Sequence, residues 1–357
     1  MKKILIVKTS SLGDIIHAYP VVDYLHKKFP AAQIDWVVEA PYAELVQAHP
    51  AIHSAITIST KAWRKQPFKA ATWKSIGAFR RQLRQNAYDV VFDLQGNVKS
   101  GLVVAQARSA HKVGFASKSV PEWPNLLFTH HRFNPKQQGN IREDYLSVVT
   151  SYFNDPLPAE SGQVTLKISS PEKDKLQAIL EHPVLHHRPK VLVCSGSAWR
   201  NKQLTPETLA AFLKLLQDEL DCAFMFAWGS KDEYEVAQQL QKQFVDSSAV
   251  VERMSLSMLQ NLMASSTLVV AMDSLPLHLA GTTLTPSFSV FGASSAEKYK
   301  PLGNRHCAFQ GSCPYGRTFV KRCPILRTCP TGACIRDLQA EEIFAYFNQW
   351  WQGLRVM

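Results

Sequence analysis

The N-terminal segment joins a short apolar run, residues 4–7, to a glycine-containing turn and then to a helical apolar pattern that extends to Leu25. A β-branched run, a turn and an amphipathic helix in this order are the opening unit of a nucleotide-type α/β fold. Ligands of such folds bind beyond the carboxyl ends of the strands, where helix N-termini offer unpaired N–H groups to anions. A carboxylate, Asp14, occupies this position. Because Asp is also a preferred helix cap, two interpretations are open: a capping residue, or a general base that faces the ligand.

Strand and helix patterns alternate along most of the chain. In the first half we expect strands over residues 4–7, 35–39, 55–58 and 88–93, and a helix over 72–85. In the second half we expect strands over residues 190–194, 222–227, 267–271 and 287–291, and helices over 206–220, 231–244, 255–264 and 338–351. This rhythm predicts an α/β protein with doubly wound parallel sheets. The polar, proline-containing stretch 155–189 is interpreted as a domain boundary, which gives lobes over 1–165 and 166–335 and a C-terminal helix within 336–357.

The composition excludes several classes of protein. A hydrophobic content of 46% with 19% charged residues is typical of a chain with a sizeable core rather than a disordered one. No run of about 18 apolar residues is present, so no transmembrane helix is expected. The net charge of +11 favours an anionic partner, and basic clusters occur at residues 61–65, 80–84 and 130–136. No nucleic-acid-binding module is recognisable, so we expect an anionic membrane face or an anionic substrate and no nucleic acid.

Seven cysteines are present, and five of them lie in the last sixth of the chain. These are Cys307, Cys313, Cys323, Cys329 and Cys334. No CxxC pair occurs, so the usual zinc-ribbon spacing is not met. Three interpretations stay open for this irregular region: reduced thiols, a bound zinc or iron ion with Cys313, Cys323, Cys329 and Cys334 as candidate ligands, or disulfides. The other two cysteines, Cys194 and Cys222, lie in apolar runs and are expected to be buried.

Several motifs together carry a resemblance to a known family. They are residues 8–17 (KTSSLGDIIH), 35–39 (DWVVE), 93–100 (DLQGNVKS), 227–229 (AWG), 253–256 (RMSL) and 273–280 (DSLPLHLA). In this order they resemble the ADP-heptose:lipopolysaccharide heptosyltransferases, glycosyltransferase family nine. The likeness is greatest to the heptosyltransferase I branch, which adds the first heptose to a Kdo-bearing lipid A precursor. It covers residues 1–290, and the cysteine-rich region lies outside it.

The resemblance implies a GT-B fold, in which two Rossmann-like lobes have parallel sheets facing a central cleft. It implies an inverting, metal-independent transfer of heptose from ADP-heptose to an inner-core acceptor. The acceptor would bind the N-terminal lobe and the donor the C-terminal lobe. Asp14 would act as the general base that deprotonates the acceptor hydroxyl, since an inverting displacement needs one deprotonation and a stabilised leaving group.

The resemblance also implies a set of residues that bind the donor. These residues are Ser197, Lys202, Glu233, Met254, Asp273, Ser274 and His278. Lys202 matches the family's phosphate-binding lysine, which would supply positive charge to the diphosphate leaving group. Two positions depart from the family pattern: Ala198 replaces a threonine, and Leu275 stands where the family has glycine. Glycine allows a close backbone approach to phosphate, so Leu275 puts the usual loop geometry in doubt.

Basic and polar residues of the first lobe would bind the acceptor. The residues implied are Ser11, Gly13, Arg64, Lys65, Gln95, Lys99, Lys136 and Arg142. Arg and Lys suit the carboxylate and phosphate groups of such an acceptor. The same charge would favour peripheral contact with the inner face of the inner membrane, so we expect a cytoplasmic protein at that surface. Two alternatives remain: a protein O-heptosyltransferase with a cysteine-bound metal, and an inactive sugar-nucleotide-binding homologue.

Overall fold

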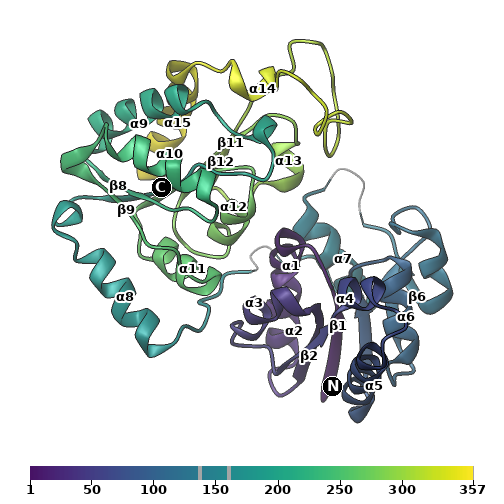
Figure 1. Cartoon of the computed structure of the whole chain (residues 1–357). Coiled ribbons are helices and arrows are strands. Elements are labelled where there is room, and N and C mark those ends of the chain that lie inside the picture. The colour runs from purple at the N-terminus through teal and green to yellow at the C-terminus, as the bar shows by residue number, and fades with distance from the viewer. Residues whose placement is uncertain (136–138, 159–161, 357) are drawn as a thin grey trace. The chain divides into compact units, whose positions relative to one another are not determined.

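A computed structural model describes residues 1–135, 139–158 and 162–356 (Figure 1). The chain divides into two compact units, residues 1–167 and 168–357, and each is described by itself. Lys136 lies outside the described residues, so nothing is said of its place. Among the described helices, none has both the length and the apolar character needed to cross a membrane.

The first unit is built on a six-stranded sheet in the order β3-β2-β1-β4-β5-β6. All of its strand pairs are parallel. Its strands are β1 (Lys3–Val7), β2 (Gln33–Glu39), β3 (Ser54–Ile58), β4 (Val90–Asp93), β5 (Lys112–Phe115) and β6 (His131–Phe133). Its α-helices are α1 (Leu12–His17), α2 (Tyr19–Lys28), α3 (Ala43–Gln47), α4 (Thr60–Lys65), α5 (Ala70–Gln85), α6 (Val98–Gln106) and α7 (Ile141–Tyr152). The strand order reverses between β1 and β4, which is where open α/β sheets bind ligands.

The second unit repeats this plan with the order β12-β11-β10-β7-β8-β9, again with parallel pairs. Its strands are β7 (Lys190–Cys194), β8 (Ala223–Phe226), β9 (Ser248–Val250), β10 (Leu268–Met272), β11 (Ser287–Phe291) and β12 (His306–Gln310). Its α-helices are α8 (Ser170–Leu180), α9 (Pro206–Leu220), α10 (Lys231–Gln241), α11 (Leu256–Ala264), α12 (Leu275–Ala280), α13 (Ala296–Tyr299), α14 (Ala333–Arg336) and α15 (Ala340–Val356). Here the strand order reverses between β7 and β10.

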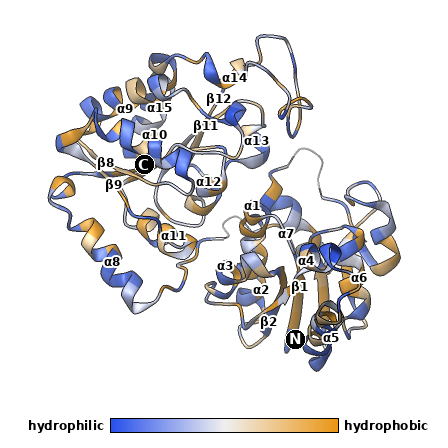
Figure 2. Cartoon of the chain, in the orientation of Figure 1, coloured by the Kyte–Doolittle hydropathy of each residue, from blue (hydrophilic) through white to orange (hydrophobic). Residues whose placement is uncertain are grey.

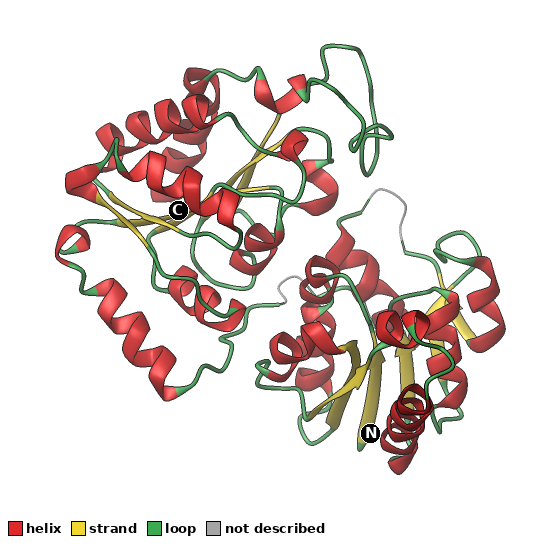
Figure 3. Cartoon of the chain, in the orientation of Figure 1, coloured by secondary structure: helices red, strands yellow, loops and turns green. Residues whose placement is uncertain are grey.

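The predicted α/β class with parallel sheets is confirmed, and helices and strands make up both units (Figure 3). The strand β7 and the helix α9 have the predicted bounds. The prediction of an irregular cysteine-rich region is wrong at its start, because Cys307 lies in β12. The sequence also gave no indication of β5, β6 and α7, and the polar stretch read as a boundary contains α8. The strands β5, β6 and β12 have only three to five residues and no extended apolar run, which leaves little periodicity to detect in the sequence.

The central strands of each sheet are buried between helices, which is why β1, β7 and β10 are almost continuously apolar (Figure 2). In the second unit the aromatic side chains of Phe212, Phe288 and Phe347 meet in the core, with ring centroids 5.2–6.1 Å apart. The terminal helix α15 packs there, and Trp351 stacks on Phe347 with a centroid distance of 5.7 Å. The last helix is therefore part of the second unit's core. Cys194 and Cys222 are buried, as predicted.

Candidate active site

Asp14 lies in the first turn of α1, directly beyond the carboxyl end of β1. Ser11 is the N-cap of this helix, and Asp14 is its capping-box partner. The Asp14 Oδ2 atom accepts hydrogen bonds from the Ser11 backbone N–H at 3.1 Å and from the Ser11 hydroxyl at 2.8 Å. The Asp14 side chain is 31% exposed. Asp14 thus has a capping role and also a solvent-accessible face, and the two interpretations of this residue are compatible.

The surroundings of Asp14 hold it in the charged form. Burial raises the pKa of Asp14, but the His17 side chain, the Lys8 charge and the Ser11 hydroxyl lower it more, and the result lies well below the ordinary value. The His17 Nδ1 atom lies 3.8 Å from the second carboxylate oxygen, Oδ1. Lys8 is buried at the end of β1, and its Nζ donates to the Tyr145 hydroxyl at 3.0 Å. Asp14 is therefore an ionised carboxylate at neutral pH.

His17 is buried beside Asp14 and is neutral at pH 7. Burial lowers the pKa of His17 to about 4, against the raising effect of Asp14, and the charges of Arg142 and Lys8 lower it further. Arg142 itself is buried on α7, where burial lowers its pKa to about 9, so it remains a cation at neutral pH. The sequence resemblance placed Arg142 among the acceptor-binding residues. The structure places it inside the unit, where its charge acts on His17.

The pKa of His17 predicts a pH-dependent stability. Between pH 6.5 and 4 the unfolded chain binds a proton at His17 more readily than the folded protein does, so stability falls as pH drops through this window. This linkage lowers the free energy of unfolding by about 2 kcal/mol between pH 7 and about pH 4.5. Urea unfolding of the His17→Asn variant at the two pH values measures this effect. Its free energy of unfolding is expected to fall by about 2 kcal/mol less than that of the wild type. Equal falls in the two proteins would contradict the prediction.

Gln95 and Asp93 organise the loop after β4 against the loop after β1. The Gln95 Oε1 atom accepts hydrogen bonds from the backbone N–H groups of Thr9 and Ser10, both at 3.1 Å. Asp93 is fully buried and accepts from Gly96 N–H at 2.9 Å, which holds the turn that leads into α6. Of the predicted residues, Ser11 and Gln95 therefore lie on these two loops and Gly13 lies in the first turn of α1, at the point where the strand order reverses.

The basic residues assigned to the acceptor are more widely spread. Lys99 is exposed on the first turn of α6. Arg64 and Lys65 are exposed at the end of α4. The start of α4 is tied to the end of β2, because the Thr60 backbone N–H donates to the Glu39 carboxylate at 3.2 Å. This contact keeps α4 near the carboxyl edge of the sheet, the edge at which Asp14 lies.

Lys202 and Asp273 form a buried ion pair in the second unit. The Lys202 Nζ lies 2.6 Å from Asp273 Oδ2, and the two side chains are 10% and 5% exposed. Lys202 follows β7 and Asp273 follows β10, so the pair joins the two strands at which the strand order reverses. Ser197, on the loop after β7, donates its hydroxyl proton to the Asp273 backbone carbonyl at 3.2 Å. Three of the predicted donor residues are thus in direct contact.

Glu233 approaches the same loops from α10. Its carboxylate accepts the Gly229 backbone N–H at 2.7 Å and caps α10 together with Ser230. It lies over Gly196, where a Cβ atom would come within 2.1 Å of the Glu233 carboxylate oxygen. The absence of a side chain at Gly196 therefore lets the Glu233 side chain of α10 lie against the loop after β7. Glu233 is half-buried and is positioned beside the loop that carries Ser197.

The other predicted donor residues occupy the loops around this point. Met254 is half-buried on the segment before α11, and Ser274 is the N-cap of α12. His278 is buried on the last turn of α12. Leu275, which departs from the family pattern, is the first residue of α12 and is half-buried, with Pro276 after it. The helix therefore begins at the position where the family has glycine. Pro276 does not disrupt it, because proline is tolerated in a first helical turn.

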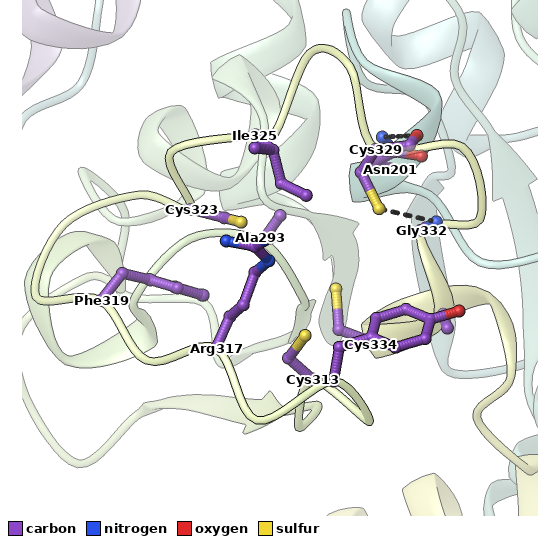
Figure 4. A pocket seen from close by; sticks show the side chains of 12 residues that line it. Asn201, Ala293, Cys313, Arg317, Phe319, Cys323, Ile325, Cys329, Gly332 and Cys334 are labelled. Carbon is purple, nitrogen blue, oxygen red and sulfur yellow. Dashed lines mark hydrogen bonds between the residues drawn. The ribbon is translucent and has the colours of Figure 1, made fainter.

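Cys313, Cys323, Cys329 and Cys334 line one pocket of the second unit, together with Arg317 and other residues (Figure 4). The Gly332 backbone N–H points to the Cys329 Sγ at 3.4 Å. However, no group of three or more His, Cys, Asp or Glu residues in the described part of the chain is arranged to hold a metal ion. Of the three interpretations of these cysteines, the bound zinc or iron ion is therefore not supported, since neighbouring sulfurs alone do not make a coordination site.

Asn201 links the cysteine-rich segment to the turn that carries Lys202. Its side-chain amide donates to the backbone carbonyls of Leu326 at 2.9 Å and Cys329 at 3.0 Å. The sequence did not single out Asn201, and it also did not single out Lys8 as a neighbour of Asp14. Lys8 lies at the end of the first strand, a position that points to a ligand edge. Asn201 has no such signal, because its partners lie more than 120 residues away.

Comparison with known proteins extends over both units. A family model described as glycosyltransferase family 9 (heptosyltransferase) matches residues 76–328. Lipopolysaccharide heptosyltransferase 1 of Pseudomonas aeruginosa is 29% identical over 297 residues, 82% of this chain and 79% of that protein. The protein of the same name from Salmonella typhimurium is 28% identical, over 81% of this chain and 88% of its own length. The solved structure of E. coli heptosyltransferase WaaC with ADP has a TM-score of 0.78 at 23% identity, covering 98% of this chain and 99% of that one.

Proposed function

The chain belongs to glycosyltransferase family 9, the heptosyltransferases, and we propose that it transfers a heptose from ADP-heptose to the inner core of a lipopolysaccharide precursor. The family membership confirms the resemblance found in the sequence. The proposal of substrate is supported by relatives named lipopolysaccharide heptosyltransferase 1. It is also supported by similar folds solved with ADP and with ADP-2-deoxy-2-fluoro heptose.

The observation that carries the proposal is the chemistry gathered where each sheet reverses its strand order. In the first unit this place holds an ionised, partly exposed carboxylate, Asp14. In the second unit it holds a lysine, Lys202, beside the Ser197 hydroxyl and the Asp273 carboxylate. Sugar transfer from a nucleoside diphosphate sugar needs a base for the acceptor hydroxyl and a cation for the diphosphate leaving group, and the two units supply one each.

Asp14 is proposed as the general base of an inverting displacement. The acceptor hydroxyl oxygen forms a bond to the anomeric carbon of heptose as the bond from that carbon to the ADP phosphate oxygen breaks, and the hydroxyl proton passes to the Asp14 carboxylate. A carboxylate with so low a pKa is a weak base. The proton is therefore transferred late, once the attacking oxygen bonds to carbon and its proton becomes strongly acidic. The surroundings of Asp14 ensure that it is deprotonated before each turnover.

Lys202 is proposed to bind the diphosphate and to stabilise the charge that develops on ADP as it leaves. Its pairing with Asp273 fixes the ammonium group in place before the donor binds, so little reorganisation is needed during the reaction. When the donor binds, Ser197 would turn its hydroxyl proton from the Asp273 carbonyl to a phosphate oxygen. Glu233 and Met254 are proposed to contact the ribose and adenine, and Ser274 and His278 to line the diphosphate and sugar region.

The acceptor is proposed to be a Kdo-bearing lipid A precursor. Arg64, Lys65 and Lys99 are exposed cations in the same unit as Asp14 and suit the carboxylates and phosphates of such a molecule. We further propose that the protein works in the cytoplasm at the inner face of the inner membrane, where a lipid acceptor of this kind is anchored.

Incubation with a panel of nucleotide sugars and acceptors tests the function against its alternatives. The proposal expects product from ADP-heptose and a Kdo-lipid acceptor only. Product with a polypeptide acceptor alone would favour a protein O-heptosyltransferase. Tight binding of ADP-heptose without product on either acceptor would favour an inactive homologue, an idea that the departures at Ala198 and Leu275 suggest.

The cysteines are proposed to be reduced thiols that serve packing. Burial raises the pKa of Cys194 and Cys222 to about 12 and that of Cys307 and Cys334 to about 11, which keeps these thiols protonated at neutral pH. In contrast, the Gly332 backbone N–H lowers the pKa of Cys329, because it stabilises the thiolate.

A thiol titration checks this proposal. In the native protein Cys329 is expected to react first with a disulfide reagent such as DTNB, and the Cys329→Ser variant is expected to lose that fast phase. After unfolding without reductant, all seven cysteines of the wild type should titrate. Fewer thiols, or a stoichiometric metal ion released on unfolding, would contradict the proposal.

A further inference from the structure

One segment of the first unit carries a dense and unopposed positive charge. Residues 45–88 contain no Asp or Glu, but they contain eight Lys or Arg residues, and the whole chain has a net charge of +11. All eight are exposed: Lys61, Arg64, Lys65, Lys69, Lys74, Arg80, Arg81 and Arg84. They lie on α4, on α5 and on the loop between them. An acid-free cationic surface of this kind attracts an anionic partner over several ångströms.

Two large aromatic side chains project from the same segment. Phe68, on the loop between α4 and α5, is 96% exposed, and Trp73, in the first turn of α5, is 64% exposed. Single exposed apolar residues are common on protein surfaces. Here, however, the two aromatic residues are five positions apart and are flanked by Lys69 and Lys74. The segment therefore combines apolar side chains with positive charge.

The packing of α4 and α5 fixes which side of the segment faces outward. Trp63 turns inward, with its ring 5.8 Å from that of Phe79 and its indole N–H donating to the Ser75 hydroxyl at 3.1 Å. Phe79 and Leu83 are buried on the inner face of α5 and belong to the core beneath the sheet. Phe68 and Trp73 take no part in that core. They are exposed on a segment that is held in place by its other face.

We propose that this segment, the α4–α5 surface (residues 61–84), docks the protein on a bilayer of anionic phospholipid. Phe68 and Trp73 enter the boundary between headgroups and acyl chains, where aromatic rings are favoured. The lysines and arginines pair with the phosphate headgroups around them. Cations with exposed aromatics also suit single-stranded nucleic acid. The choice of a bilayer rests on the proposed function, because a lipid acceptor is anchored in a bilayer and α4 carries two residues proposed to bind it.

A second acid-free segment supplies a matched control. Residues 298–336 also contain eight Lys or Arg residues and no Asp or Glu. Two of these cations lie over aromatic rings, Arg322 over Tyr299 and Arg327 over Trp199, with guanidinium-to-centroid distances of 5.1 and 4.9 Å. Tyr315 and Val320 are exposed in this segment to nearly the same extent as Trp73. Their replacement therefore tests whether any exposed apolar pair on a basic segment has the same effect.

Co-sedimentation with lipid vesicles that lack any acceptor tests the proposal. The full chain is expected to bind vesicles containing phosphatidylglycerol and to leave pure phosphatidylcholine vesicles largely unbound. The double variant Phe68→Ser/Trp73→Ser should lower binding about tenfold, since it removes the inserted apolar surface. Lys69→Gln/Lys74→Gln should lower it several-fold and weaken its salt dependence. The control Tyr315→Ser/Val320→Ser should bind as the wild type does.

Four results would overturn the proposal. The first two are that the wild type does not bind phosphatidylglycerol vesicles and that the Phe68/Trp73 variant binds them as well as the wild type does. The third is that only the control variant loses binding, and the fourth is that the protein binds a single-stranded oligonucleotide through Phe68 and Trp73 more tightly than it binds vesicles. Failure of the proposed function gives a different signature, because vesicle binding would persist while ADP-heptose gave no product. The Phe68/Trp73 variant should also retain its turnover of a detergent-dispersed acceptor, which shows that the surface serves docking and not catalysis.

Discussion

Replacement of Asp14 by asparagine is expected to lower kcat by about 10²- to 10⁴-fold, the range found when a positioned general base is removed. The amide has nearly the shape of the carboxylate, and its oxygen can still accept the hydrogen bonds from Ser11 that cap α1. It cannot accept the acceptor's proton. The change therefore affects the chemical step, and ADP binding in the second unit should stay within about twofold of the wild type. Single-turnover kinetics and calorimetric titration with ADP measure the two effects separately.

Asp155→Asn is the matched control for this experiment. It removes the same charge from the same unit, at a carboxylate that pairs with Lys28 and lies apart from the loop after β1. Its kcat is expected to equal that of the wild type. An Asp14→Asn enzyme that keeps a third or more of the wild-type kcat would show that Asp14 is a capping residue and not the base.

Replacement of Lys202 by methionine is expected to destabilise the second unit and to abolish tight ADP binding. The change leaves the Asp273 carboxylate buried without its partner, and breaking a buried ion pair in this way costs about 3–5 kcal/mol. Methionine retains the length and the apolar stem of lysine, so packing is nearly preserved. Urea unfolding and ADP titration of the variant report stability and donor binding independently.

The double variant Lys202→Met/Asp273→Asn separates these two effects. An amide at position 273 removes the unpaired charge, so most of the lost stability should return. Affinity for ADP should not return, because the cation that binds the diphosphate is still absent. A single variant as stable as the wild type would contradict the buried pair, and a double variant with restored ADP affinity would contradict the role of Lys202.

The fold was predictable where residue patterns are long and regular. The strand β7 and the helix α9 have the predicted bounds because an uninterrupted apolar run and a 15-residue amphipathic repeat leave little ambiguity. The short strands β5 and β6 did not appear in the sequence, since they are defined by their neighbours in the sheet and not by a local pattern. In the same way α8 was hidden in a polar stretch, because none of its residues is buried.

The candidate site was predictable in its positions and less so in its interactions. Asp14 and Lys202 were identified by motif, and both lie beside the strands at which the sheets reverse their order. The pairing of Lys202 with Asp273, 71 residues away, is a product of the fold and has no local signal. Arg142 shows the limit most clearly, because a basic residue in a polar segment looks exposed in the sequence but is buried on α7. Its charge lowers the pKa of His17, an effect that has no signal in the sequence.

The central claim is transfer of heptose from ADP-heptose to a Kdo-bearing lipid acceptor, and mass spectrometry of the acceptor after incubation with the purified protein tests it most directly. The account predicts that the acceptor gains one heptose for each ADP released, and that the new linkage has the anomeric configuration opposite to that of the donor. An unchanged acceptor in the presence of bound ADP-heptose would contradict the transfer, and a product with retained configuration would contradict the single-base mechanism.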